Sequence, residues 1–162
     1  MFKPGDMVMY GSHGVCCVTD VREETFGPVC RTYYVLQPKK DARSTFYCPV
    51  TQEARLRALL TKEEVTRLIR EMPLTDTLWE EDDLARRDRF SALLKSGDHT
   101  EVVRLIKTLY HQRRLRAEQG KKLYLADERI LQEAERLLHE EIAYVMEIPP
   151  DEVVAYIEET LG

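Results

Sequence analysis

The stretch DMVMYGSHGVCCVTDV, residues 6–21, decides the fold of the first third of this 162-residue chain. Short runs of apolar, aromatic and β-branched residues, Met7–Tyr10 and Val15–Val21, flank the turn formers of residues 11–14. This arrangement is typical of two strands joined by a tight connection. We therefore expect the chain to begin with β structure.

The strand-like pattern continues to about residue 50. Two further runs cover residues 32–36 and 45–50, and turn formers separate them at Gly27-Pro28 and at residues 38–41. Four or five short strands linked so closely predict a small barrel or a strongly bent sheet. A sheet of this size keeps exposed edges, at which a strand of a partner can add.

After residue 60 the apolar residues recur at helical spacing. Thr61 and Glu64 form a capping-box signature, and the helix that follows should end at Pro73. Further helices are expected from about residue 76 or 78 to 94, from 98 or 100 to near 120, over 126–146 and over 151–161. The chain is thus predicted to be α+β, with a β-barrel domain over residues 1–58 and an all-α domain over residues 59–162.

Composition excludes several classes of function. The longest apolar runs are far shorter than the roughly 18 residues that span a bilayer. The N-terminus lacks the layout of a secretory signal, so we expect a cytoplasmic protein without a membrane partner. The four cysteines contain no CxxC pair, and the four histidines have no ligand-like spacing, so no metal or other cofactor is expected. A nucleophile and base made of Cys17 and His13 would be the only enzymatic alternative, in a segment that favours packing.

The net charge of −5 conceals an uneven distribution. Residues 84–122 carry eleven basic and four acidic side chains, a net charge of +7, between acidic blocks of −5 (residues 61–83) and −9 (residues 123–162). A polyanion could bind the basic block. The alternative is that opposite charges on neighbouring helices pair with each other or face solvent.

The basic block contains candidate phosphate contacts close to the only tryptophan of the chain. Guanidinium groups bind phosphate oxygens without reading sequence. Trp79 stands just before the block and is followed by four acidic residues, which favour a helix N-terminus. Its ring is either an exposed wedge for DNA or an anchor packed in the core, and we expect substantial exposure. The candidate DNA-binding residues are Trp79, Arg86, Arg87, Arg89, Lys121, Lys122 and Arg129, with a second row at Arg104, Lys107 and Arg114.

Taken together, these segments resemble the CarD/CdnL family of bacterial transcription regulators. Residues 2–15, FKPGDMVMYGSHGV, are similar to its F-x-x-G-D-x-V-x-Y-x-x-H-G signature, and YYVL at 33–36 and YCPV at 47–50 are similar to its later strands. Its helical half is similar to residues 96–98, 102–109 and 127–134. The first motif alone also fits the polymerase-binding module of transcription-repair coupling factors, but the helical half and the absence of helicase motifs argue against that class.

The resemblance implies a non-enzymatic regulator with two contacts. A Tudor-like N-terminal barrel would pair its edge strand, here Ser44, Thr45, Phe46, Tyr47 and Cys48, with the β subunit of RNA polymerase. The helical domain would touch promoter DNA weakly, with a tryptophan wedged into the minor groove, and so stabilise the open complex. The chain would be a monomer or a strand-exchanged dimer.

Two departures from the family pattern temper this expectation. The family's tryptophan is often followed by arginines, whereas acids follow Trp79 here, so DNA contact should be weaker than polymerase contact. Glu24 and Tyr47 stand where some members have basic residues, so the polymerase surface should rely on backbone pairing and on Phe46 or Tyr47. The alternative function is a polymerase-bound protein-interaction adaptor with little or no DNA binding.

Overall fold

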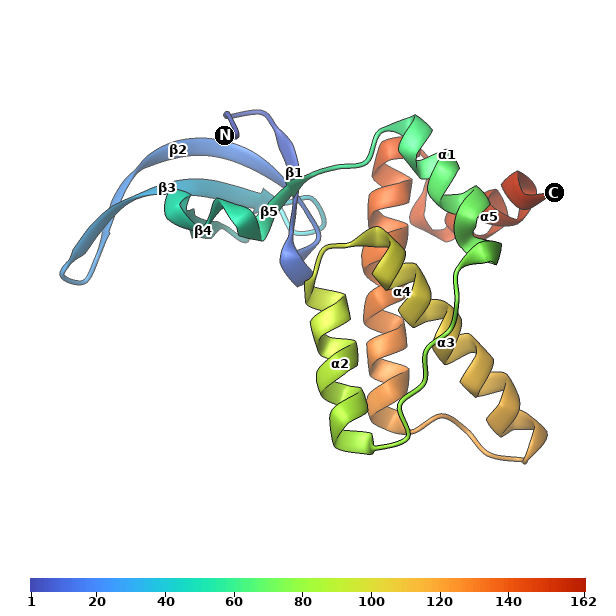
Figure 1. Ribbon diagram of the computed structural model, residues 1–162. Coiled ribbons are helices and arrows are strands. Elements are labelled where there is room, and N and C mark those ends of the chain that lie inside the picture. The colour runs from blue at the N-terminus through green and yellow to red at the C-terminus, as the bar shows by residue number, and fades with distance from the viewer. The chain divides into compact units, whose positions relative to one another are not determined.

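The computed structural model describes residues 1–162 and divides into two compact units, Met1–Leu59 and Leu60–Gly162 (Figure 1). The first is built around a β-sheet and the second consists of helices. This arrangement confirms the predicted α+β class. Each unit has its own hydrophobic core.

The N-terminal unit is a five-stranded antiparallel sheet in the order β4-β3-β2-β1-β5. Its strands are β1 (Met7–Tyr10), β2 (Val15–Phe26), β3 (Val29–Pro38), β4 (Phe46–Pro49) and β5 (Leu56–Ala58). Short 3₁₀ helices, η1 (Gly11–His13) and η2 (Val50–Arg55), make two of the connections. The long, curved hairpin of β2 and β3 turns at Gly27, whose positive φ of 62° suits glycine (Figure 1).

The sheet is not closed into a barrel, which corrects the barrel expected from the sequence. Closure would require β4 to pair with β5, but these two strands occupy opposite edges of the sheet. The three-residue β5 pairs only with β1, and η2 takes up the chain between β4 and β5. The unit therefore keeps two open edges, and β4 forms one of them.

Alternation along the strands sorts the side chains of this sheet onto two faces. Tyr34, Leu36 and Cys48 are fully buried in the core of the unit, together with Val8 and Cys16. Tyr33 and Tyr47 belong to the opposite set, as the period of two requires. The second face thus carries aromatic rings beside the β4 edge.

The C-terminal unit contains five α-helices. These are α1 (Lys62–Glu71), α2 (Asp83–Lys95), α3 (His99–Glu118), α4 (Leu125–Met146) and α5 (Val153–Leu161), with 3₁₀ turns η3 (Met72–Leu74) and η4 (Pro150–Glu152). The third and fourth helices lie within two residues of the predicted bounds. The helix α4 packs against each of the other four, and Leu131, Ala134 and Ile142 on its inner side are fully buried. None of the helices is long and apolar enough to cross a membrane.

The start of α2 differs from the expectation. The sequence predicted a helix from about residue 76 or 78, but α2 begins at Asp83 because the Asp82 carboxylate accepts a hydrogen bond from the Ala85 amide, 2.9 Å away, and caps it. Trp79 therefore lies in the segment before the helix rather than in its first turn. That segment is fixed to α3 where the Leu78 amide donates to the Thr108 hydroxyl, 2.9 Å away.

The predicted capping box at the start of α1 is present. The Thr61 hydroxyl accepts from the Glu64 amide at 3.1 Å, and the Glu64 carboxylate accepts from the Thr61 amide at 3.0 Å. The hydrogen bond from the Thr61 amide, and after it one from the Thr61 side chain, hold the pKa of the Glu64 carboxyl below its ordinary value. The box gives the helical unit a defined starting point.

We expect Thr61→Ala to lower the free energy of unfolding of the helical unit by about 1 kcal/mol, because it removes the cap. Thr66→Ala is the matched control, since the Thr66 hydroxyl only donates back to the Lys62 carbonyl within the same helix. Urea unfolding followed by circular dichroism measures both variants. Equal effects at the two positions would contradict a specific role for the cap.

Candidate functional site

One end of the helical unit gathers most of the residues that the sequence singled out. The N-termini of α2 and α4 and the C-terminus of α3 lie at this end, and α1 and α5 lie toward the other (Figure 1). We call it the Trp79 end, and it comprises residues 79–89 and 113–129. Helix N-termini carry partial positive charge, so the capping acids found here have a structural function.

Trp79 is half-buried, so the expected substantial exposure is wrong. Its ring faces the guanidinium of Arg86, whose Cζ atom is 4.4 Å from the ring centroid. Its other near neighbour is Phe90, at a centroid distance of 6.2 Å, and the indole joins the edge of the helical core. One part of the ring is thus held by packing, and the remainder reaches the surface.

Arg86 is 1% exposed and cannot be the phosphate contact that the sequence predicted. Its Nε and Nη2 atoms donate to the two oxygens of Asp127, which is itself fully buried, at 3.2 and 3.1 Å. Its Nη2 also donates to Asp83 at 2.8 Å, and its Nη1 donates to the carbonyls of Glu80 and Glu81 at 3.1 and 3.4 Å. Every face of the guanidinium is occupied inside the protein.

The charge balance of this pair is favourable despite its burial. Desolvation lowers the pKa of Arg86, but the hydrogen bonds and charges of Asp127 and Asp83 outweigh it and hold that pKa above its ordinary value. Arg86 is thus cationic at every physiological pH. The acids after Trp79 are partly explained as well, because Asp82 caps α2 and Asp83 neutralises Arg86.

Tyr124, which the sequence analysis did not single out, continues the stack begun by Trp79. Its ring lies 5.6 Å from the Cζ atom of Arg86 and 4.3 Å from that of Arg116. Trp79, Arg86, Tyr124 and Arg116 thus form an alternating series of aromatic rings and guanidinium groups. Tyr124 remains 46% exposed. No spacing in the sequence relates residues 79, 86 and 124, so only the fold reveals this series.

The remaining candidate cations are exposed, but they do not form one row. Arg87 and Arg89 flank the buried side of α2 and point to different sides, because two residues advance about 200° around a helix. Lys121 and Lys122 lie in the loop beside Tyr124, where the Nε atom of Arg116 donates to the Lys122 carbonyl at 2.6 Å. Arg129 follows the inward-facing Asp127 by two residues and so points away from Arg86.

The second basic row on α3 is largely engaged within the protein. The Lys107 ammonium donates to the carbonyls of Met72, Pro73 and Thr75 at 3.2, 2.9 and 2.6 Å. Arg104 lies 3.8 Å from Glu101, and Arg113 lies 3.8 Å from Glu128. Arg113 thus pairs with an acid of a neighbouring helix, as the alternative interpretation of the charge pattern stated, whereas Arg104 pairs within α3 and Lys107 binds carbonyls rather than acids.

The predicted polymerase-binding segment is shorter as a strand than expected and divides between two faces. Ser44 precedes β4, and its hydroxyl donates to Asp41 at 2.6 Å, while Thr45 is exposed. Phe46 and Cys48 point into the core of the sheet unit, so their side chains are not presented to a partner. Tyr47 points to the other face, and the backbone of β4 forms the free edge.

Tyr47 belongs to an aromatic cluster on that second face. Its ring lies 5.1 Å from Phe26 and 6.2 Å from Tyr33, and Phe26 and Tyr33 are 5.2 Å apart, all in edge-to-face geometry. Phe26, at the tip of the hairpin, is 48% exposed. The sequence identified Tyr47 but not Phe26, because residues 21 positions apart meet only through the curvature of the hairpin.

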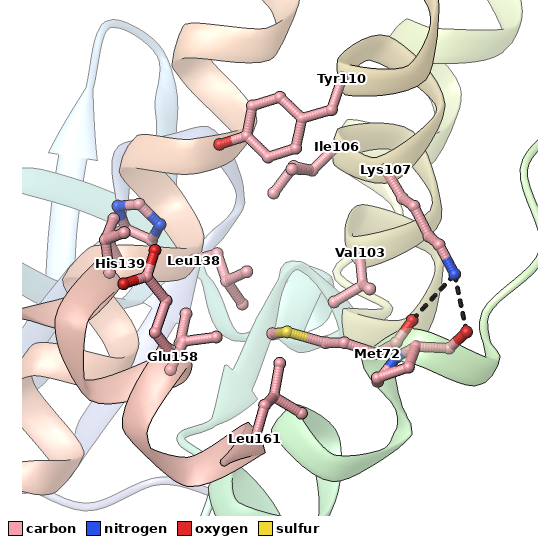
Figure 2. Close-up of a pocket in the computed structure, with 12 residues that line it drawn as sticks. Met72, Val103, Ile106, Lys107, Tyr110, Leu138, His139, Glu158 and Leu161 are labelled. Carbon is pink, nitrogen blue, oxygen red and sulfur yellow. Dashed lines mark hydrogen bonds between the residues drawn. The ribbon is translucent and has the colours of Figure 1, made fainter.

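An apolar groove of about 350 Å³ lies between α3, α4, α5 and η3 (Figure 2). Burial lowers the pKa of its His139, and burial together with Glu135 raises the pKa of its Tyr110 to about 12. Both groups are therefore uncharged at neutral pH. Lys107, at the rim, is held by carbonyls as described above. The groove offers hydrophobic surface rather than an acid–base pair.

Cys16, Cys48 and His13 take part in the packing of the sheet unit. Cys16 and Cys48 are buried, and burial raises the pKa of the Cys48 thiol. His13 packs against the rings of Phe46 and Tyr10, at 4.3 and 5.0 Å. No group of three His, Cys, Asp or Glu side chains lies close enough together to hold a metal ion.

Comparison with known families accounts for both units. Residues 2–60 match the CarD-like/TRCF RID domain, and residues 64–158 match the CarD C-terminal domain. No curated protein matches the sequence closely enough to be compared with it. The RID domain implies interaction with the β subunit of RNA polymerase, and the family consists of non-enzymatic transcription factors. Since the two matches cover nearly the whole chain in order, it belongs to the CarD family.

Proposed function

We propose that this protein binds the β subunit of RNA polymerase through its sheet unit and stabilises the promoter open complex through the Trp79 end of its helical unit. A ligand shifts the equilibrium between closed and open complexes only by its difference in affinity for the two. An aromatic wedge that enters melted or distorted DNA provides such a difference, because an intact duplex must first be unstacked to accept it. The observation that carries the proposal is the surface formed by Trp79, Tyr124 and the exposed cations beside them.

The β4 edge supports the polymerase contact. An edge strand presents unpaired amides and carbonyls, and a partner strand adds to them in register. On one side of this edge, Tyr47 and Phe26 offer aromatic surface to the added strand. Backbone pairing and apolar contact would thus take the place of the basic residues that the family resemblance led us to look for at Glu24 and Tyr47.

The cations near the Trp79 end support a weak DNA contact. Arg87, Lys121 and Lys122 are exposed at this end, and none of them forms an ion pair. Such residues neutralise backbone phosphates without sequence preference. The nearby acids should repel DNA phosphates less than their number suggests. Asp82 accepts a hydrogen bond from the Ala85 amide and Asp83 accepts one from Arg86.

A polymerase-bound adaptor without DNA contact is the second candidate. It is favoured by the burial of Arg86 and the partial burial of Trp79, which leave less cationic and aromatic surface than the sequence indicated. A gel shift on fork-junction promoter DNA over a range of salt concentrations, with and without polymerase, distinguishes the two. The adaptor predicts that the protein alone does not shift the DNA and that adding it leaves the fraction of DNA bound by polymerase, and the salt dependence of that binding, unchanged.

For the polymerase contact, we expect Tyr47→Pro to weaken binding to the isolated β lobe by roughly five- to tenfold, because one backbone donor is lost from the edge. Tyr47→Ala removes the ring but keeps the amide, so comparing the two variants separates backbone pairing from aromatic packing. Calorimetric titration of the full chain gives both affinities. Unchanged binding of the proline variant would exclude β4 as the docking edge.

For the wedge, we expect Trp79→Ala to shorten the lifetime of the open complex and leave binary binding to polymerase intact. Stacking of an aromatic side chain on a base contributes about 1–3 kcal/mol, which corresponds to roughly a 5- to 150-fold change. Leu84→Ala is the control, because Leu84 lies on the same end of α2 and is 69% exposed. A heparin-challenge decay that is identical for Trp79→Ala and the unmodified protein would refute the wedge.

For the phosphate contacts, we expect Arg87→Glu combined with Lys121→Glu to weaken association with DNA and flatten its dependence on salt. Each lost phosphate contact lowers the slope of log K against log salt by about 0.9. Arg70→Glu, an equally exposed charge reversal on α1 at the other end of the unit, should leave the slope unchanged. A slope that changes equally in both proteins would indicate a general charge effect rather than a contact at the Trp79 end.

A further inference from the structure

We propose that Arg86 and Asp127 form a buried positioning pair that holds Trp79 in one orientation for its contact with DNA. The inference rests on the proposed function for its consequence at the promoter, but the positioning itself concerns the free protein. It assigns Arg86 a role other than the phosphate contact that its place in the basic block predicts. It also gives Asp127, on a different helix, a role in the function of Trp79.

The segment around Trp79 is fixed on both sides. The Leu78 amide is bound to Thr108 of α3, as described above. On the other side, Nη1 of Arg86 binds the carbonyls of Glu80 and Glu81, the two residues that follow the tryptophan. Trp79 itself lies between these anchors, and the Cζ atom of Arg86 lies over its ring, 4.4 Å from the ring centroid.

Among the basic side chains, only arginine can satisfy the acceptors that surround position 86. Three of its nitrogen atoms reach Asp127, Asp83 and the two carbonyls at once, which requires a planar fork with several donors. Lysine has a single nitrogen and no planar surface to place against an indole. The side chain therefore combines charge neutralisation, backbone anchoring and stacking in one group.

Asp127 fixes Arg86 to the helix α4. Asp127 lies in the first turn of α4, the helix that packs against all others, and it is fully buried. Its two oxygens bind two nitrogens of Arg86, so the guanidinium cannot rotate without breaking both bonds. The orientation of Trp79 is therefore fixed by the core of the unit rather than by a surface loop.

A wedge that is already oriented binds with less loss of side-chain freedom than a mobile one. Immobilising one side chain on binding reduces affinity by roughly two- to tenfold. Loss of the pair should therefore shorten the open-complex lifetime by roughly two- to tenfold, even where the indole is still present.

Trp79 is the only tryptophan in the chain, so its intrinsic fluorescence reports the positioning directly. In the unmodified protein we expect time-resolved anisotropy to show an indole that moves with the whole helical unit. Arg86→Lys and Asp127→Asn should add a fast local motion and increase quenching by acrylamide. Arg87→Met, on the adjacent exposed residue, should change neither. A fast, large-amplitude motion of Trp79 in the unmodified protein would overturn the proposal without any variant.

A second set of variants separates positioning from stability. Replacing a buried ion pair by apolar residues of similar size often preserves stability. We therefore expect Arg86→Met combined with Asp127→Leu to retain the melting temperature but lose the rigid indole and shorten the open-complex lifetime. If this variant unfolds, Arg86→Lys provides the same two readouts. A variant with normal anisotropy and normal quenching, but without the guanidinium, would contradict the assignment.

Double substitution shows whether the pair acts through Trp79. In a Trp79→Ala background, Arg86→Lys should cause no further shortening of the open-complex lifetime, because the group that it positions is absent. Additive effects would mean that Arg86 acts by another route and would overturn the proposal. If Trp79→Ala alone leaves the lifetime unchanged, the proposed DNA contact fails, whereas the fluorescence measurements still decide the positioning.

Discussion

The hydrogen-bonded pair of Arg86 and Asp127 is the interaction on which the helical unit depends most at its Trp79 end. Removing two charges from water costs desolvation free energy. Their mutual attraction offsets this loss only where the geometry is good and additional hydrogen bonds form. Here the carboxylate is bound through both oxygens, and the remaining donors of the guanidinium meet Asp83 and two carbonyls. Removing one partner of such a pair typically costs about 3–5 kcal/mol. Because α2, α4 and the Trp79 segment meet at this pair, the shape of the surface follows from it.

The sequence predicts the local features of this protein well and its long-range contacts poorly. The capping box at Thr61 and the helices on either side of Gly97 follow from residues within one or two turns, so a linear pattern contains them. The start of α2 was misplaced because several acids could cap it and only the fold selects Asp82. The prediction of a closed barrel was also wrong, because the pattern of apolar residues in the strands does not indicate which strands pair. Arg86 looks like its neighbour Arg87 in sequence, but its counter-ion lies 41 residues away.

The same distinction explains the electrostatics. A net charge of +7 over residues 84–122 predicts a strongly basic surface, but Arg86 and Lys107 bind acceptors inside the unit. The folded protein thus offers DNA fewer cations than the sequence contains. Counterion release scales with the phosphates that are neutralised, so intrinsic affinity for duplex DNA should be low and strongly dependent on salt. Low affinity is compatible with a regulator that must find polymerase rather than any DNA.

In the proposed function each of the two compact units makes one contact, and a weak DNA contact is then sufficient. Once the sheet unit is bound to polymerase, the helical unit is confined near the promoter at an effective concentration in the millimolar range for a short connection. A contact too weak to retain free DNA is then occupied for much of the time. In the proposed function, specificity for the open state would follow from the wedge, which gains affinity where bases are unstacked, and promoter localisation would follow from polymerase. A fixed indole suits this division, because tethering already supplies proximity and what remains to be supplied at the DNA is orientation.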